Sequence, residues 1–430
     1  MSALPTPRAS ELPPGAGEGV GEDDAGRADW RRVFVVFWIT SMVEGLTVSQ
    51  VFAFLPAYLR VVGVPEDDRA AFVGLFSALI FVVGMPLVPL WGVWADKYSR
   101  KAVVARSAIV EAVVFACVAL SREPWQLAIS LLLIGFQLGN TGVMLAAIRD
   151  VVPRRRIGTL IALFGVAGPI GFAVGPFLGG VLVDGLGWSL SGMFWLSCLL
   201  SVGIAALVWF GAAEVRPAVI PTGRVLPLAY GAVRGVLTDP VIRRIFLIYG
   251  VAFLANQMTR PYQPLIVEDI VGSGPGLAAS IAVVVGLGGL VGATISPIGG
   301  WISDHVGFRP VLITALGGGG IALLAIPIVR TLPPLTVSVM TFTAANALVG
   351  AMVFSLLATE VPAARRSQTL NLVYLPLYAA GIIGPAVGGT LAGLFGTTAP
   401  FYAGAVVFLV GAVVVALRVH PRPVDEGAPA

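Results

Sequence analysis

The stretch "WGVWADKYSRKAVV", residues 91 to 104, gathers four charges into fourteen positions of a chain that is 12% charged and 57% hydrophobic. A partial copy, "GGWISDHVGFRPVL", stands at residues 299 to 312, so that Asp96 and Asp304 are 208 residues apart. "GPFLGG" at residues 175 to 180 and "GPAVGG" at residues 384 to 389 keep almost the same offset. Motifs that recur at one period indicate an internal duplication.

The composition indicates a chain that is surrounded mostly by lipid. Soluble domains carry about 25% charged residues, and this chain of 430 residues has half that share. Apolar blocks of about 18 residues or more are long enough to cross a membrane. Twelve such blocks occur, at residues 33–59, 70–95, 102–120, 125–148, 157–183, 188–213, 242–267, 276–302, 310–329, 335–359, 368–394 and 399–417.

We therefore predict an all-α membrane protein with twelve transmembrane helices in two six-helix pseudo-repeats. The N-terminal bundle covers residues 31–213 and the C-terminal bundle residues 242–418, and residues 214–241 form a cytoplasmic linker. Residues 1–30 are rich in proline, glycine and acid and are predicted to be a disordered tail, with a second short tail at residues 419–430. In such repeats one half can rock against the other around a central site.

The distribution of positive charge predicts the orientation in the cell membrane. If both chain ends are cytoplasmic, all but five of the 27 Lys and Arg residues lie on cytoplasmic segments or helix ends. This bias follows the positive-inside rule. It also accounts for the net charge of +4, so we expect no nucleic-acid partner. The five exceptions are Arg60, Arg69, Arg122 and Arg330 on exterior loops and Arg260 within the seventh span.

The first charged stretch resembles the loop signature of the major facilitator superfamily, G-x-x-[AS]-D-[RK]-x-G-[RK]-[RK]. The matching residues are Gly92, Ala95, Asp96, Lys97, Arg100 and Lys101, and in the second copy Gly300, Ser303, Asp304, Gly307 and Arg309. The resemblance implies a cytoplasmic gate, with Asp96 near the start of the eleventh span. It also implies that Arg100 contacts Asp150 and that Arg309 contacts Glu360. Alternatively, these charges only anchor the loops at the lipid headgroups.

A glycine motif in the fifth span resembles a signature of the antiporter branches of this superfamily, above all the twelve-span drug:proton exporters. Gly171, Gly175 and Gly179 recur every four residues and share one helix face, next to Pro176 and Gly180. Such a face allows close helix packing, and proline permits a kink. The resemblance implies a hinge and outward export. One departure is that Leu131 stands where those exporters commonly carry an arginine in the fourth span.

Three ionisable residues are predicted to lie within the membrane: Glu44, Glu111 and Arg260. Charges there are costly and usually functional. Glu44 shares a helix face with Thr40, Ser41 and Thr47, and we expect this polar stripe to face a wet cavity. Because a carboxyl group away from water favours its protonated form, Glu44 is the first candidate for proton coupling. For Glu111 a structural hydrogen bond and a proton role remain equal alternatives.

Further polar residues are candidates for the substrate cavity, although each alone could simply join two helices. Arg260 either lines the cavity or extends to the exterior headgroups. The remaining candidates are Gln137, Asn140, Asn256, Gln263, Asn346, Asn371 and Tyr374.

The predicted function is proton-coupled export of small apolar or amphipathic organic compounds by alternating access. The alternatives are a proton-coupled importer of a nutrient or metabolite and a transporter-fold sensor that does not transport. Cys117 and Cys198 lie in apolar spans and suggest no disulfide, and no cofactor or metal site is expected. We do not expect an enzyme. We expect a monomer whose partners are the lipid bilayer, protons and a small-molecule substrate.

Overall fold

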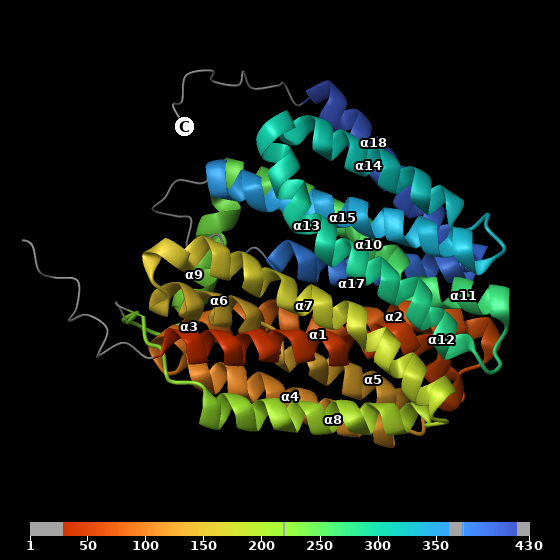
Figure 1. Cartoon of the computed structure of the whole chain (residues 1–430), viewed down its shortest axis with the longest axis horizontal. Helices are drawn as coiled ribbons and strands as arrows, with labels where there is room; N and C mark the ends of the chain where they lie inside the picture. Colours follow the sequence, from red (N-terminus) through yellow and green to blue (C-terminus); the bar gives the residue numbers. More distant parts are fainter. Residues whose placement is uncertain (1–28, 218–219, 361–371, 373, 419–430) are drawn as a thin grey trace, which may run out of the picture.

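A computed structural model describes residues 29–217, 220–360, 372 and 374–418 of the chain. These residues form helices and connecting segments, without a strand among them (Figure 1). Within this part of the chain, eleven helices are long and apolar enough to cross a membrane. The predicted all-α class is confirmed.

The N-terminal half contains the first six predicted spans. Span 2 consists of two helices, α2 and α3, and π-helical turns follow α7 and α8. The elements are α1 (Trp30–Val61), α2 (Glu66–Val82), α3 (Gly84–Lys97), α4 (Arg100–Leu120), α5 (Pro124–Leu133), η1 (Ile134–Phe136), α6 (Asn140–Val151), η2 (Arg154–Arg156), α7 (Ile157–Gly180), η3 (Val181–Gly185), α8 (Leu190–Ala206) and η4 (Leu207–Gly211).

The C-terminal half repeats this plan, but its first span is interrupted. Pro261 and Pro264 lack the N–H group that a continuous helix needs, and a 3-10 turn separates two helices there. The predicted span 242–267 is therefore not one continuous apolar helix. The elements are α9 (Val225–Thr238), α10 (Pro240–Thr259), η5 (Arg260–Tyr262), α11 (Gln263–Val271), α12 (Leu277–Ile281), η6 (Ala282–Gly286), α13 (Leu287–Val306), α14 (Phe308–Ala325), α15 (Leu332–Glu360), α17 (Tyr374–Phe395) and α18 (Ala399–Arg418).

The segment predicted as a linker, residues 214–241, contains helix α9. This helix packs against α3 of the first half and α10 of the second. The hydroxyl of Tyr230 donates a hydrogen bond to the carbonyl oxygen of Pro86 at 3.1 Å. The connection between the halves is therefore partly ordered and docked, which composition alone did not indicate.

The glycine face of α7 packs directly against α1. A Cβ atom at Gly171 would overlap the carbonyl oxygen of Met42, and one at Gly175 would overlap Ser49. Pro176 is buried within α7, which continues to Gly180. The close packing expected of this motif is present, and its use as a hinge remains a prediction.

The two halves meet mainly through α2 and α7 of the N-terminal half. α2 packs against α17, and α7 packs against α12, η6 and α13. α2 and α7 belong to the N-terminal half, whereas α17 and α13 belong to the C-terminal half. Any separation of the halves must therefore break these contacts. Close contacts between α7 and the C-terminal half include Gly180 with Ala282, and Ala173 with Gly289.

One apolar cluster is shared by the two halves, and two smaller clusters each belong to a single half. We call the end where α1 begins and α18 ends the near end, and the opposite end, with α11 and α12, the far end (Figure 1). One cluster of buried side chains joins both halves and includes Tyr58 and Tyr262. Towards the near end there are two separate clusters, one around Phe37 in the first half and one around Phe246 in the second.

Candidate functional site

Two carboxyl groups are buried on neighbouring helices inside the N-terminal half. The side-chain amide of Asn140, at the start of α6, donates a hydrogen bond to Glu44 of α1 at 2.5 Å. Glu111 of α4 accepts a hydrogen bond from the hydroxyl of Thr47, about one turn beyond Glu44 on α1. Both glutamates are at most 8% exposed. Because Thr47 and Glu44 share one face of α1, Glu111 belongs to the same polar site as Glu44.

A third ionisable group at this site, Arg106 of α4, was not among the candidates predicted from the sequence. Its guanidinium carbon lies 3.6 Å from the centre of the Trp91 ring. Nη2 donates to the carbonyl oxygen of Gln137 at 3.3 Å and to the hydroxyl of Ser107 at 3.4 Å. Nε and Nη1 are buried without a hydrogen-bond partner among the described residues. The buried site therefore holds two acids and one base.

The depth of Arg106 in its span is the property that could have revealed it. By its position near the helix start, Arg106 is counted with the cytoplasmic end of the span. It lies five residues beyond Lys101, which is about 7.5 Å along a helix. A long side chain from that depth can reach the middle of the bundle.

The polar stripe of span 1 does not face water in this conformation. Thr40 and Thr47 are fully buried. The hydroxyl of Thr40 donates to the carbonyl oxygen of Val36 at 2.8 Å, and that of Thr47 contacts Glu111. Ser41 is also buried, close to Gly168 of α7. The structure corrects the expectation of a wet stripe, because these hydroxyls find their neighbours inside the protein.

Arg260 lies between the two halves, and its role in lining the substrate cavity stays a prediction. Its guanidinium carbon lies 3.9 Å from the ring centre of Phe52 and 4.2 Å from that of Phe172. Both rings belong to the N-terminal half, on α1 and α7, whereas Arg260 belongs to η5 of the other half. The side chain is therefore part of the contact between the halves.

The other cavity candidates are distributed over both halves. Gln137 is buried beside Arg106, Gln263 is buried on α11, and Asn256 is half-buried on α10. The Oδ1 atom of Asn346 is buried without a partner in the described part of the chain. Asn371 and the side chain of Tyr374 lie outside the described residues.

The signature loop between spans 2 and 3 forms a compact ion cluster within the N-terminal half. Arg100, 2% exposed, pairs with Asp96 and with Asp150, each at 2.8 Å. Glu214 accepts a hydrogen bond from the backbone N–H of Arg100 at 2.9 Å. The ammonium of Lys101 lies over the Trp209 ring. The expected contact between Arg100 and Asp150 is thus present.

The second copy of the loop is described only in part. Arg309 donates to the carbonyl oxygen of Ala416 on α18 at 2.7 Å. A Cβ atom at Gly300 would meet no neighbour within 4 Å. The side chains of Asp304 and Glu360 are outside the described set, so the expected pairing of Arg309 with Glu360 stays a prediction.

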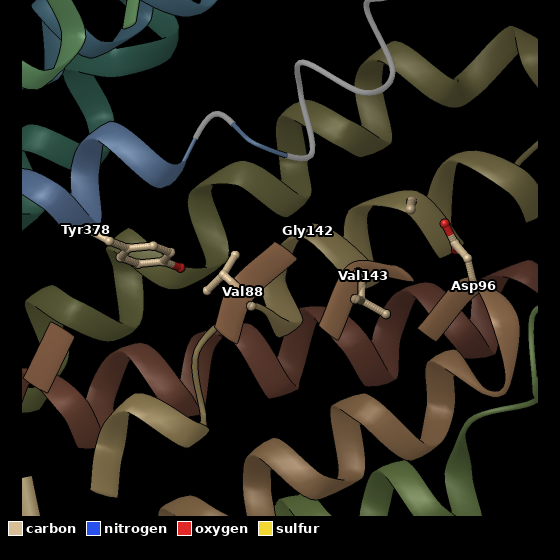
Figure 2. A pocket seen from close by; sticks show the side chains of 8 residues that line it. Val88, Asp96, Gly142, Val143 and Tyr378 are labelled. Atoms are coloured by element: carbon tan, nitrogen blue, oxygen red, sulfur yellow. The ribbon is translucent and has the colours of Figure 1, made fainter. Parts of the chain in front are cut away.

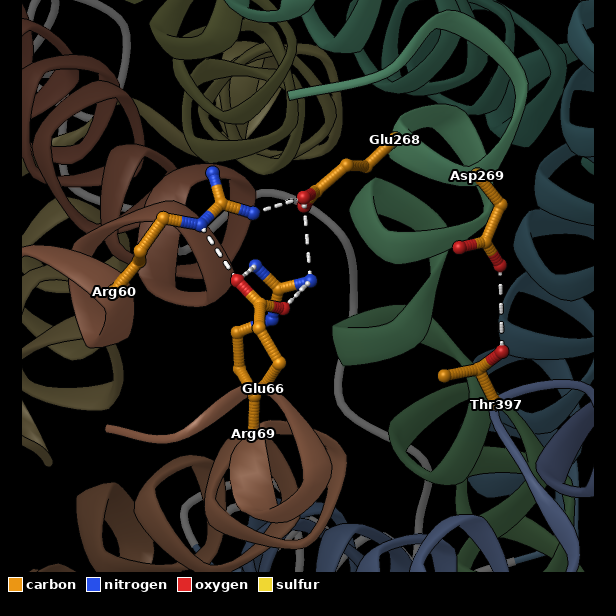
Figure 3. Close-up of polar contacts among 6 residues, drawn as sticks. All are labelled: Arg60, Glu66, Arg69, Glu268, Asp269 and Thr397. Carbon is orange, nitrogen blue, oxygen red and sulfur yellow. Dashed lines mark hydrogen bonds and ion pairs between the residues drawn. The ribbon is translucent and has the colours of Figure 1, made fainter. Parts of the chain in front are cut away.

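A second ion cluster joins the two halves at the far end (Figure 3). Arg60 and Arg69 both contact Glu66, at 3.0 and 2.8 Å, within the N-terminal half. Both also contact Glu268 of α11 in the C-terminal half, Arg69 at 3.2 Å. From the sequence these arginines indicate only the orientation of the chain. The available signal was spacing, because Arg60 and Glu268 are 208 residues apart, the offset of the internal repeat.

Comparison with known proteins decides the family. The family model of the Major Facilitator Superfamily matches residues 33–370 and, in an overlapping match, residues 245–430. The chain belongs to the major facilitator superfamily. It is therefore a multi-pass membrane transporter by family, as the signature loop and the repeat predicted.

Curated members of the superfamily include relatives named multidrug resistance protein MdtG. The protein from Yersinia enterocolitica is 26% identical over 316 residues, which is 73% of this chain and 75% of the relative. The protein from Enterobacter lignolyticus is 25% identical over 398 residues, covering 91% and 93% of the two chains.

Solved structures of the superfamily share the fold over nearly the whole chain. The human organic anion transporter MFSD10 (TETRAN) superposes with a TM-score of 0.64 at 20% identity, covering 90% of this chain and 99% of that protein. The nucleoside transporter NupG gives a TM-score of 0.69 at 14% identity, covering 89% and 97%. At these identities the likeness concerns the fold alone.

In this major facilitator protein a small cavity lies between the halves toward the near end (Figure 2). Residues of α3, including Val88, Gly92 and Asp96, line it together with Val143 of α6. Tyr378 of α17 lines it from the C-terminal half. Two residues of the signature loop, Gly92 and Asp96, therefore border the cavity. The expected position of Asp96 near the start of span 11 stays a prediction.

Proposed function

We propose that the protein is a proton-coupled exporter of small apolar or amphipathic organic compounds, working by alternating access with both chain ends in the cytoplasm. The observation that carries this proposal is the pair of buried carboxyl groups, Glu44 and Glu111, beside Arg106. Among the described residues neither carboxyl group is ion-paired, and their hydrogen bonds come from the neutral side chains of Asn140 and Thr47.

This arrangement suits reversible protonation. Removal of a carboxyl group from water favours its neutral form, and a nearby cation favours the ionised form. Arg106 keeps two nitrogen atoms without a partner within the described structure. It bonds the carbonyl oxygen of Gln137, three residues before the Asn140 that bonds Glu44. A small movement of α1 against α4 would bring Arg106 and Glu44 together and release the proton from Glu44.

The packing of the halves supports alternating access. The halves share one apolar cluster, and each has a smaller cluster of its own toward the near end. A transporter in this state receives substrate from the near end, which we assign to the cytoplasm. Opening the far end requires the contacts of Glu268 and the packing of α2 on α17 to separate.

The cavity and the relatives both favour export of organic compounds. Val88, Val143 and Tyr378 give the small cavity apolar and aromatic walls. Such walls would suit apolar or amphipathic molecules once the halves separate further. The relatives at 25–26% identity carry the name multidrug resistance protein. We extend that activity to this chain as part of the proposal.

The test is accumulation of labelled apolar and amphipathic compounds in everted membrane vesicles, with and without a proton gradient. Glu44→Gln keeps the side-chain shape but cannot ionise, so gradient-driven accumulation should fall to background while ligand binding remains measurable. Glu111→Gln should alter the pH dependence of transport because the two carboxyl groups interact. Asp68→Asn, at an exposed position, is the control and should leave transport unchanged.

Three results would contradict the proposal. Gradient-driven accumulation only in right-side-out vesicles would identify an importer. Binding without movement in either orientation would identify a sensor. If Glu44→Gln still accumulates compounds against a gradient while Glu111→Gln does not, the proton is carried through α4 and the assignment to Glu44 is wrong.

A further inference from the structure

The guanidinium of Arg260 is held between aromatic rings of the opposite half. It lies against the faces of Phe52 and Phe172, at 3.9 and 4.2 Å from the ring centres. The two rings themselves are 6.1 Å apart between centres. Two of the three guanidinium nitrogens, Nε and Nη2, are shielded from solvent and have no hydrogen-bond partner among the described residues. Arg260 as a whole is only half-buried, so part of it remains accessible.

Among the residues that the structure describes, no carboxylate of its own half contacts this cation. Within residues 242–418 the carboxylates are Glu268 and Asp269, close to the far end, and Asp304 and Glu360, close to the near end. Glu268 is eight residues from Arg260, or about 12 Å along a helix, and it already contacts two other arginines.

The two buried acids of the N-terminal half each have a hydrogen-bond partner of their own. Glu44 is bonded by Asn140 and Glu111 by Thr47. A charge within the membrane is costly and is rarely kept without a partner or a use. Aromatic faces attract a guanidinium, but they accept none of its five N–H groups as strong hydrogen bonds. The hydrogen-bonding capacity of Arg260 is therefore largely unused.

The unused donors suit one chemical class. A guanidinium presents parallel N–H groups whose spacing matches the two oxygens of a carboxylate, phosphonate or sulfonate. The rings beside it form a continuous aromatic path. Phe52 stacks on Phe81 at 6.5 Å, and Phe81 lies 6.0 Å from Tyr378, which lines the cavity between the halves.

We propose that Arg260 binds the acidic group of an amphipathic organic anion, whose apolar body contacts the aromatic rings of Phe52, Phe81, Phe172 and Tyr378. The proposal rests on the transport function proposed above and narrows its substrate class. Because Arg260 and the two rings that cover it belong to different halves, binding at this position also depends on how the halves are arranged.

The experiment measures equilibrium binding to the purified full-length protein in lipid nanodiscs, without any proton gradient. The probes are radiolabelled 1-naphthylacetate and 1-naphthylacetamide, which share the aromatic body and differ in charge. The wild type should bind the acid about ten-fold or more tightly than the amide, as expected for charge-assisted hydrogen bonds. Arg260→Gln should remove this preference and leave amide binding unchanged.

Two further variants complete the test. Arg330→Gln is the matched control, because Arg330 is an exposed arginine of the same half on a loop at the far end, and it should keep the preference. Arg260→Lys retains the charge but not the paired donors, so the preference should fall several-fold. If Arg260→Gln does not fold, the preference for acid over amide measured in Arg260→Lys tests the inference instead.

The outcomes separate this inference from the proposed function. Equal binding of acid and amide by the wild type, or an undiminished preference in Arg260→Gln or Arg260→Lys, overturns the inference even if proton-driven export of neutral compounds is observed. A preference for the acid that depends on Arg260 supports the inference even if no proton-driven transport occurs. In that case only the proposed function is wrong.

Discussion

Replacing Glu268 by glutamine should shift the protein toward a conformation in which the far end is open. Among the described residues, Glu268 is the member of the far-end ion cluster that comes from the C-terminal half, and it contacts both Arg60 and Arg69. Glutamine keeps the side-chain shape but removes the charge. The two guanidinium groups then share Glu66 alone, within their own half.

The size of the shift follows from the exposure of the cluster. The side chains of Glu268 and Arg69 are 9% and 11% exposed, and that of Arg60 is 34% exposed. Removing one partner of a fully buried pair costs about 3–5 kcal/mol, whereas an exposed pair contributes about 0–1 kcal/mol. Because water screens Arg60 and Glu66 remains, we expect about 1–2 kcal/mol, which changes the ratio of closed to open molecules roughly 5- to 30-fold.

The populations can be measured as distances between spin labels across the far end. Labels at Arg122 and Thr331 would report the separation, because both positions are exposed on loops of different halves at that end. The two free cysteines, Cys117 and Cys198, are first replaced by alanine. Double electron–electron resonance in nanodiscs should show a longer-distance population in Glu268→Gln that is minor in the parent protein.

The neighbouring residue provides the control. Asp269→Asn removes the same charge one position away, but Asp269 is hydrogen-bonded to Thr397 within its own half at 3.4 Å. This variant should keep the parent distance distribution. Identical distributions for Glu268→Gln and the parent, or an equal shift in Asp269→Asn, would show that the cluster does not hold the far end closed.

Three other variants test the packing and the topology. Arg100→Gln breaks a buried ion network and should cost about 3–5 kcal/mol, seen as a lower midpoint of thermal unfolding in detergent, whereas Lys101→Gln should change it little. Gly175→Ala places a methyl group against the backbone of α1 and should cost about 1–3 kcal/mol in the same assay. Gly165→Ala should be neutral, because an added Cβ atom there would meet no neighbouring segment within 4 Å. Equal effects of the two variants would contradict the packing. A cysteine at Asp67 should react with a membrane-impermeant thiol reagent on intact cells, and labelling only after permeabilisation would reverse the proposed orientation.

Much of the fold could be predicted because hydropathy and repetition are properties of the chain itself. The length of apolar blocks indicates spans, and two copies of one loop indicate two halves. The break in span 7 could not be read from hydropathy, because Pro261 and Pro264 interrupt the helix without making the segment polar. Helix α9 was missed because its surroundings are rich in proline, glycine and charge.

The polar site was less predictable because it depends on contacts between distant segments. Glu44 and Glu111 could be found by their depth along a span, but the hydrogen bond from Thr47 of α1 to Glu111 of α4 joins distant segments. Arg106 was assigned to the membrane surface by its Cα position, although its side chain extends inward. Arg260 was found from the sequence, but the sequence does not show which rings of the other half cover it.

The contact between Arg60 and Glu268 has a consequence for the origin of the fold. The two positions are 208 residues apart, the same offset as Asp96 and Asp304, and so they correspond in the internal repeat. In an ancestor assembled from two identical halves, both positions would have held the same residue, and like charges would have repelled each other across the axis. The opposite charges therefore arose after the duplication, once the two copies could diverge. For the same reason, two copies of the present N-terminal half would place arginine against arginine, so this half is not expected to form the closed far end with itself.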